Sequence, residues 1–340
     1  MLGAQSDAPV VTRTSALPRA PQRLLAPILA LTATASLAQQ SIEPDDLAAA
    51  RSALQSDIDA EAMGAAYAAM VSVTTAPEIS AATYRIRDGS SAQPTMRLYK
   101  LPLAWSLGEG GRAWQPFAHA SLGLMEFGIR FELLGEAVRT RWTAYGGSVG
   151  LGVRIPRGHW TWIVQGGIGV VRIENRAHYR GVLGQTLLAP LFKGLIFDWH
   201  ADAAKYSVAV GADFRRDFAP WRLELRTRLS GARADTFSSS SEFVDFDATG
   251  AALTIRSDAS RAIAYRVAGR PTRAHLSLGA TAHLGAQRDA LGFDRFVEAG
   301  GGIELDLADR AQPIESVRLG MLAIFGPDVV GWSLSASLGF

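Results

Sequence analysis

The segment 198–207, DWHADAAKYS, contains the residue types of a hydrolytic site. The acid, base and nucleophile of a catalytic triad could come from Asp198, His200, Asp202 and Ser207. A triad is recognised by its geometry, so closeness along the chain is weak support for one. A polar loop is the simpler interpretation, and we expect a protein that is not an enzyme.

The histidines and glycine-rich stretches do not form a metal or nucleotide site. His275 and His283 share a predicted strand face, but eight residues of strand at about 3.3 Å each place them roughly 25 Å apart. The stretches GLGVR and GGIGVVR do not open a helix with the spacing of a phosphate-binding loop. The chain has no cysteine, which removes thiolate ligands. We therefore expect no metal and no cofactor.

Charged residues form a third group of candidates; they alternate with apolar residues in WRLELRTRLSG and VEAGGGIELDL. One strand face collects Arg222, Glu224, Arg226, Arg228, Glu298, Glu304 and Asp306. The basic residues Arg154, Arg172 and Arg215 could extend this group. If this face lines a lumen, its charges allow two interpretations. They could make a diffusion channel selective, or they could form internal salt bridges, which stiffen the wall or dock an acidic helix. Buried charges need partners, which favours the second interpretation and a plugged lumen.

Strands must position these side chains, because from about residue 83 onward the apolar period is two. The alternation predicts twelve strands, at 80–87, 95–107, 113–128, 139–154, 158–174, 203–216, 220–231, 248–257, 273–286, 292–307, 315–326 and 329–340. Ten or fourteen strands are the alternatives. Such a sheet is either a soluble sandwich with an apolar core or a membrane barrel with its apolar face towards lipid.

Three features favour the barrel. Its predicted strands are longer than those of soluble sheets. Their second face is rich in Gly, Ser and Ala, which suits a cramped interior. Aromatic residues stand near strand ends, as in an interfacial girdle: Trp105, Trp114, Tyr145, Trp160, Trp162, Trp199, Tyr206, Trp221 and Trp332. We therefore predict an all-β transmembrane protein, a twelve-stranded antiparallel outer-membrane β-barrel over 80–340, with an N-terminal α-helix inside its lumen.

The residues before the barrel divide into two segments. Residues 1–38 have a basic flank, the apolar run LLAPILALTATASLA and small residues before Gln39, which is typical of a secretory signal peptide. Residues 39–79 form an Ala-rich helix and linker; within 41–70, six acidic side chains stand against Arg51 alone. This helix is either a solvated surface helix or one that lies in a channel of opposite charge. The chain as a whole holds 34 basic and 32 acidic residues, so a nucleic-acid partner is not expected.

The chain closes with GWSLSASLGF, an alternating strand that ends on an aromatic residue. Its apolar face includes Trp332, Leu334, Leu338 and Phe340. This ending resembles the assembly signal of bacterial outer-membrane proteins. The resemblance implies that the barrel assembly machinery of the outer membrane is a partner.

The layout of a barrel preceded by an Ala-rich helix resembles the translocator domain of autotransporters, over roughly residues 41–340. Little precedes the helix once 1–38 is removed, so the chain is more similar to solitary autotransporter-type barrels, which lack a passenger. The resemblance implies a Gram-negative outer-membrane location with periplasmic termini. We expect a monomer whose contacts are membrane lipid and, through outer loops at 175–202 and 232–247, an extracellular ligand that the sequence does not identify. A porin-like diffusion channel and an outer-membrane hydrolase are the alternatives.

Overall fold

The computed structural model describes residues 44–57, 81–87, 94–108, 113–133, 135–241, 244–267, 269–285, 293–307 and 316–339. The predicted signal peptide at 1–38, most of the linker up to residue 80, and Phe340 lie outside the described residues. None of the helices in the described ranges has the length and hydropathy of a membrane-spanning helix.

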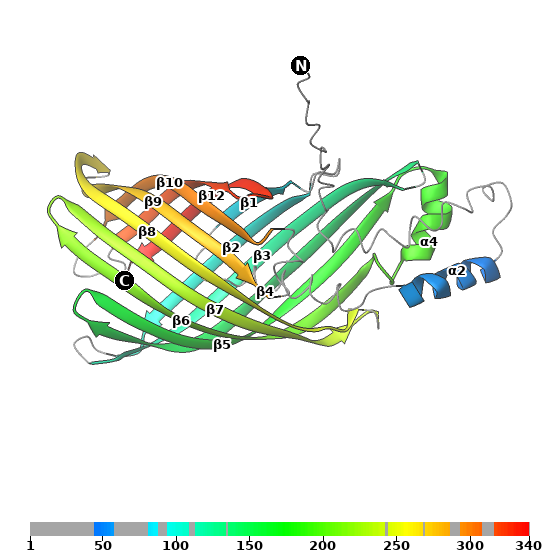
Figure 1. Cartoon of the computed structure of the whole chain (residues 1–340), viewed down its shortest axis with the longest axis horizontal. Helices are drawn as coiled ribbons and strands as arrows, with labels where there is room; N and C mark the ends of the chain where they lie inside the picture. Colours follow the sequence, from blue (N-terminus) through cyan, green and yellow to red (C-terminus); the bar gives the residue numbers. More distant parts are fainter. Residues whose placement is uncertain are drawn as a thin grey trace, which may run out of the picture.

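Twelve antiparallel strands close into one barrel, in the order β1-β12-β11-β10-β9-β8-β7-β6-β5-β4-β3-β2 (Figure 1). Their bounds are β1 Ala81–Ile86, β2 Thr95–Ser106, β3 Gln115–Leu133, β4 Glu136–Arg157, β5 Trp160–Tyr179, β6 Trp199–Phe218, β7 Trp221–Ser239, β8 Asp247–Val267, β9 Arg270–Leu284, β10 Arg295–Asp306, β11 Ser316–Phe325 and β12 Val329–Gly339. The predicted count of twelve and the antiparallel barrel are confirmed. Neighbours along the chain pair throughout, so the sheet is a meander closed by β1 against β12.

The two ends of the barrel differ. Ala81 pairs with Leu334 and Ile86 with Val329, so β1 begins at the end of the barrel where β12 finishes. We call this the terminal end; it also carries the two-residue turns 158–159 and 219–220 and the short connection from β8 to β9. The opposite end, called here the loop end, carries the long connection 180–198, with a π-helical turn η2 (Gly184–Leu188) and a short helix α4 (Ala189–Phe192).

Several strands run further than the alternation predicts. The predicted loop 175–202 shrinks to 180–198 and the predicted loop 232–247 to 240–246, because β5, β6 and β7 continue into them. β8 runs to Val267 instead of ending at 257. A strand that leaves the apolar layer meets water outside, so its outer face becomes polar and the period-two signal fades. The barrel wall is consequently uneven: β4 has 22 residues, whereas β11 has 10.

The outer face is the apolar one, as predicted. Large apolar side chains are exposed along it on every long strand, including Val149, Leu151, Ile168, Val208 and Leu276. The predicted girdle aromatics that the structure describes are exposed in the same way, with one exception. Trp199 is only 2 % exposed, its Nε1 donates to the Ile196 carbonyl oxygen at 2.9 Å, and it stacks edge-on against Trp142. This side chain belongs to the interior, and its assignment to the girdle was wrong.

Glycine allows two strands to approach a buried histidine inside the barrel. His275 is 3 % exposed. A Cβ on Gly302 would come within 2.7 Å of the His275 ring and 2.6 Å of the Gly320 Cα, and would also meet the carbonyl oxygen of Leu319. The imidazole therefore occupies the volume that a side chain at Gly302 would need.

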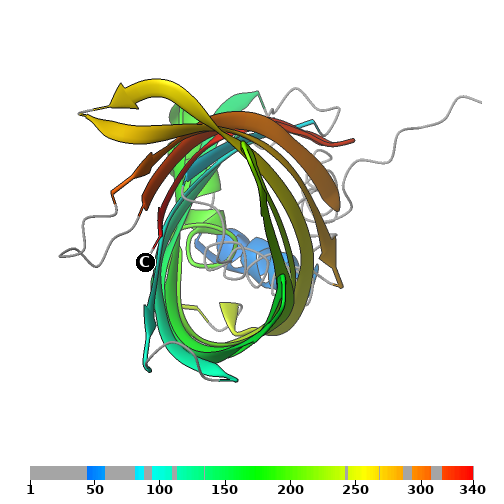
Figure 2. The ribbon, with the colours of Figure 1, turned by 90° about the vertical axis from the view of Figure 1, so that its left-hand side faces the viewer.

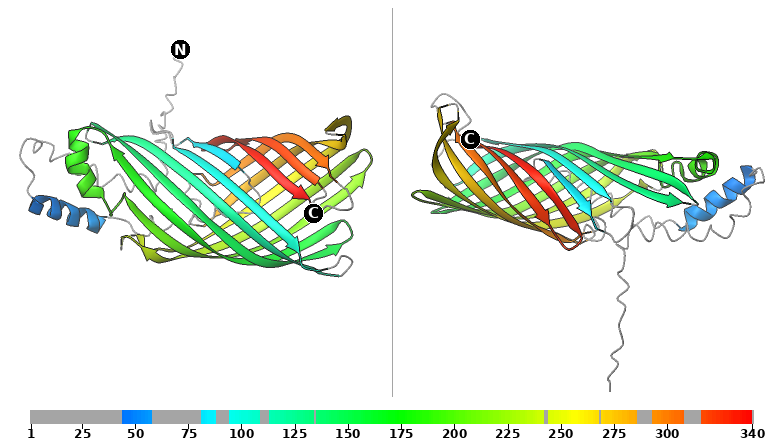
Figure 3. Two further views of the ribbon diagram at one scale, coloured as in Figure 1. Left: turned by 180° about the vertical axis from the view of Figure 1, so that it is seen from behind. Right: turned by 90° about the horizontal axis from the view of Figure 1, so that it is seen from above.

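The acidic helix is present as α2 (Pro44–Asp57) and lies at the loop end, beyond the strands (Figures 1 and 3). Viewed along the barrel, it crosses the opening (Figure 2). Leu54 is 3 % exposed and packs in a cluster with Leu188, Leu191 and Phe192. Its position differs from the predicted one inside the lumen: the described part of the helix covers the mouth and contacts the segment that carries α4.

Arg51 fastens α2 to this segment. It donates from Nη1 to the carbonyl oxygen of Pro190 at 2.8 Å and from Nη2 to that of Lys193 at 2.7 Å. These carbonyls lie in and just after α4, where oxygens lack partners within the helix and attract a cation.

We expect Arg51→Ala to loosen this contact by about 1–2 kcal/mol in total, because Arg51 makes two exposed hydrogen bonds and each contributes about 0.5–1 kcal/mol net. Amide hydrogen exchange in 44–57 and 184–197 should then accelerate by about 5–30-fold, following the equilibrium constant for local opening. Ser52→Ala, on an exposed position of the same helix, is the control and should leave exchange unchanged. Equal exchange in both variants would show that Arg51 does not hold the helix.

Candidate functional site: a charge network inside the barrel

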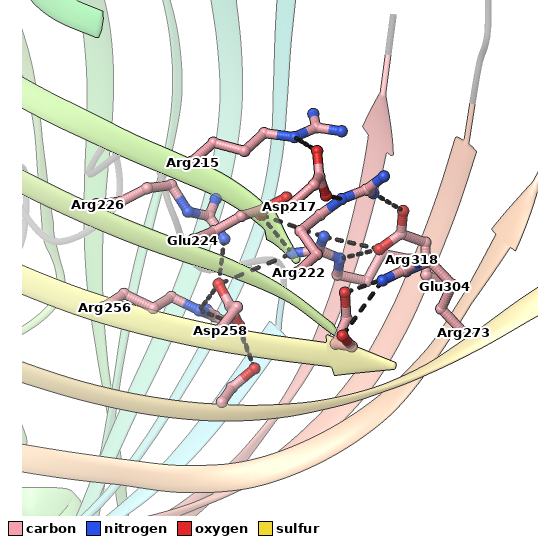
Figure 4. A network of polar contacts seen from close by, with 12 residues as sticks. Arg215, Asp217, Arg222, Glu224, Arg226, Arg256, Asp258, Arg273, Glu304 and Arg318 are labelled. Carbon is pink, nitrogen blue, oxygen red and sulfur yellow. Dashed lines mark hydrogen bonds and ion pairs between the residues drawn. The ribbon is translucent and has the colours of Figure 1, made fainter. Parts of the chain in front are cut away.

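Arg318 on β11 is the centre of a network of charges in the lumen (Figure 4). Its Nη2 donates to Glu304 Oε2 at 2.8 Å and its Nη1 to Glu224 Oε2 at 3.2 Å. A third carboxylate oxygen, Asp258 Oδ2, lies 3.7 Å from Nη1. The Arg318 side chain is 13 % exposed, and one guanidinium therefore holds carboxylates from three other strands.

The contact between Arg318 and Glu224 crosses the lumen. Glu304 is opposite Arg318 in the register of neighbouring strands β10 and β11. Glu224, however, lies on β7, which β8, β9 and β10 separate from β11 in the sheet. The two side chains therefore meet inside the barrel from strands that are four places apart in the twelve-stranded wall, and Figure 4 shows the contacts between the labelled side chains. A second bridge of this kind joins Arg222 on β7 to Glu304, at 3.3 Å.

Asp258 on β8 anchors the other half of the network. It is 1 % exposed, and Arg226 Nη2 donates to its Oδ2 at 2.6 Å. Arg256 approaches the same carboxylate at 3.5 Å, and the Ser277 hydroxyl donates to Oδ1. Two guanidinium groups and a hydroxyl thus compensate a carboxylate that has lost its water.

Further pairs extend the network along β6 and β7. Arg228 donates from both terminal nitrogens to Asp213, at 2.6 and 3.0 Å, in the two-point geometry that suits arginine and carboxylate. Arg222 also donates to Asp217, at 2.7 Å. These residues come from the first half of β7 and the last part of β6, close to the 219–220 turn. The network accordingly lies towards the terminal end of the barrel, away from α2.

The inner-face charges predicted from the sequence are found on the inner face. Arg222, Glu224, Arg226, Arg228 and Glu304 are joined in the network; Glu298 is 8 % exposed on the same face of β10, and Asp306 is exposed at the end of that strand. Arg172 was assigned to the wrong face: it pairs with Glu174 at 3.2 Å and Asp202 at 3.4 Å on the outside of the wall. Arg154 lies inside, over the Phe117 ring at 4.4 Å.

Arg318, which joins the two halves of the network, was not predicted, and neither were Asp258, Asp213 and Asp217. A signal was present in SVRLGMLAIF, where Arg318 falls on the polar parity between Val317 and Leu319. The same alternation places Asp258 on the inner face of β8, but β8 was expected to end at 257. Pairing across the lumen depends on barrel closure and stagger, which a single strand does not reveal.

The possible catalytic residues do not come together. Asp202 pairs with Arg172 outside the wall, and the Ser207 hydroxyl donates to the Gly167 carbonyl at 3.3 Å. The amide of His200 donates to Ser240 Oγ at 2.8 Å, and Asp198 Oδ1 accepts from the Ala177 amide at 3.0 Å. Within the described ranges, no cluster of three His, Asp or Glu residues could hold a metal ion. The contacts of each candidate thus lead to a different neighbour.

The barrel's family follows from a direct match. A family model described as the solitary outer membrane autotransporter beta-barrel domain matches residues 84–337. The chain belongs to this family. Autotransporter barrels of this kind are outer-membrane proteins of Gram-negative bacteria, so the apolar outer face is the one that meets lipid. A comparison with curated proteins finds no match.

Three solved autotransporter structures resemble this solitary barrel. The beta domain of the Bordetella autotransporter BrkA is 15 % identical, with a TM-score of 0.47, over 75 % of this chain and 94 % of that one. The transport unit of AIDA-I from Escherichia coli is 10 % identical, with a TM-score of 0.49, over 82 % and 99 %. The translocator domain of NalP from Neisseria meningitidis is 9 % identical, with a TM-score of 0.44, over 80 % and 91 %. With such low identities and TM-scores, the family match alone decides the classification.

Proposed function

We propose that this solitary autotransporter barrel acts by itself as a closed, non-enzymatic outer-membrane protein with a structural or surface-interacting role. The observation that carries the proposal is the bridge from Arg318 to Glu224, which spans the lumen between β11 and β7. The mouth at the other end carries α2, packed against α4 through Leu54. Both contacts lie where a solute or an exported chain would have to pass.

The barrel is oriented with its terminal end in the periplasm. Short turns at 158–159 and 219–220, the short connection from β8 to β9 and the long connection at 180–198 support this orientation, because outer-membrane barrels have short periplasmic turns and longer extracellular loops. The extracellular surface then includes the segment 180–198, α2 and the connection 240–246. A ligand of the protein would bind there.

The remaining partners follow from the outer face and the last strand. Membrane lipid covers the apolar belt. Because the closed sheet offers no free strand edge for pairing with another chain, we propose a monomer as the functional unit. Trp332 and Leu334 expose about half of their surface on the outer face of β12; the side chain of Leu338 and all of Phe340 lie outside the described residues. The alternation of β12 supports its role as a signal to the barrel assembly machinery.

Planar-bilayer recording of the full chain tests the closed lumen. We expect no wide, steady pore, because the guanidinium of Arg318 and its carboxylates occupy the path and are held by several charge-assisted hydrogen bonds. A porin of known conductance in the same bilayers confirms that insertion is detected. A stable open pore in the intact protein would establish the diffusion-channel alternative instead.

A further inference from the structure

A trench runs along β9 on the lipid-facing side of the barrel. Its floor consists of two small residues, Ala280 and Ala282, which are successive on the outer face of that strand. In the sheet register, Ile255 on β8 and Val297 on β10 lie on either side of Ala280. Phe325 on β11 follows Val297 in the same row. Two alanines between rows of large side chains leave a hollow because they have too little volume to fill it.

This trench is a cavity of about 480 Å³, within the range of about 300–1,000 Å³ that is typical of ligand sites. Its walls are apolar, and large side chains such as Ile255, Val297 and Phe325 remain more than 40 % exposed. Because these side chains belong to the belt that faces lipid, the molecule that fills the trench comes from the membrane. Hydrocarbon is the chemistry that matches the walls.

A cation stands at one end of the trench. Arg295 is opposite Ala282 in the register and begins β10, next to the connection 285–294 at the loop end. Its side chain is 69 % exposed and has a carboxylate neighbour, Asp294, only at 3.9 Å, which is long for an ion pair. An exposed pair of this kind contributes at most about 1 kcal/mol, so Arg295 keeps its capacity to bind another anion.

We propose that this trench binds one acyl chain of a phosphorylated lipid of the outer leaflet, with a headgroup phosphate on Arg295. Hydrocarbon fills the hollow over Ala280 and Ala282, and the guanidinium at the loop end meets the phosphate where the headgroups begin. Arginine suits this role because its planar fork of donors binds phosphate oxygens in pairs. The proposal rests on the orientation given above, which places the loop end, and therefore Arg295, in the outer leaflet.

Native mass spectrometry of the folded full chain, titrated with diphosphorylated lipid A and with its dephosphorylated form, tests the site. Ala280→Phe fills the trench, and we expect it to weaken binding of both forms by about tenfold or more, as the loss of a well-packed chain should. Ala299→Phe is the matched control, because Ala299 is also exposed on the outer face but does not line the trench. It should bind like the wild type.

Arg295→Ala should remove the preference for the phosphorylated form, about five- to tenfold, while binding of the dephosphorylated form stays unchanged. Arg141→Ala, on an exposed outer position of β4, controls for loss of positive charge and should keep the preference. Equal binding by the Ala280 and Ala299 variants would overturn the trench as a site, and an unchanged preference without Arg295 would overturn its role. Bilayer conductance does not enter this readout, so failure here is distinct from failure of the closed lumen.

Discussion

Replacing Arg318 with alanine is expected to destabilise the barrel by about 3–5 kcal/mol and to make its lumen leak cations. The energy follows from removing one partner of a buried charge network, which leaves carboxylates desolvated without compensation. Glu224 would lose the guanidinium that reaches it across the lumen, whereas Glu304 and Asp258 would keep other arginines. The leak follows because the vacated space would be lined by carboxylate oxygens.

Urea unfolding in detergent, followed by tryptophan fluorescence, measures the first effect, and bilayer recording measures the second. Arg233→Ala is the matched control: Arg233 also pairs with a carboxylate, Asp247, with Nε 2.9 Å from Oδ1, but the two side chains are about half exposed. Its loss should cost only about 0–1 kcal/mol and should leave conductance unchanged. If the two variants proved equally stable and equally closed, the network would hold neither the fold nor the lumen.

Gly302→Ala is the second change with a large expected effect. The added methyl group would meet the carbonyl oxygen of Leu319 and would lie 2.6 Å from the Gly320 Cα, both backbone atoms of the partner strand. A flexible side chain could move aside, but the backbone of a paired strand cannot do so without breaking its register. Overpacking of this kind typically costs about 1–3 kcal/mol, and here we expect the upper part of that range or beyond.

The same unfolding assay, together with the gel mobility of unheated protein, reports this loss as a lower urea midpoint and a smaller folded fraction. Gly231→Ala makes the identical change in β7, where the nearest neighbouring atoms would be 3.9 Å away. It should alter stability by no more than about 0.5 kcal/mol, as most substitutions without a clash do. Wild-type stability in the Gly302 variant would mean that β10 and β11 do not approach each other as described.

The sequence predicts the barrel well because the alternation of apolar and polar residues, which defines a barrel strand, is a local property. Alternation along β7 or β10 can be recognised from a single strand, and it assigned Arg222 and Glu304 to the same face, where they pair. The strand ends were harder to predict from the sequence, because β5 and β6 continue beyond the apolar belt with polar residues such as Arg176 and Asp202 on their outer face. Without an apolar face, such extensions resemble loops.

The partners of the inner charges could not be predicted in the same way. Which carboxylate meets Arg318 depends on the stagger between twelve strands and on the width of the closed barrel, both of which are collective properties. The helix shows the same limit: its composition identifies α2, but its acidic charge suggested a partner in the lumen. Its described contacts are made by Leu54 and Arg51 with the 188–193 segment.

Because its wall is uneven, the barrel is taller on one side than on the other and is not symmetric about the membrane normal. β3 to β7 have 19–22 residues, whereas β10 to β12 have 10–12. A difference of about eight residues along tilted strands amounts to about 20 Å in height. In the proposed orientation the rim slopes, and η2 and α4 overhang it from the tall side. A molecule approaching from outside therefore reaches the mouth from the side, over the low rim of β10 to β12. The tall and the low side of one barrel also present different surfaces to neighbouring molecules in the membrane.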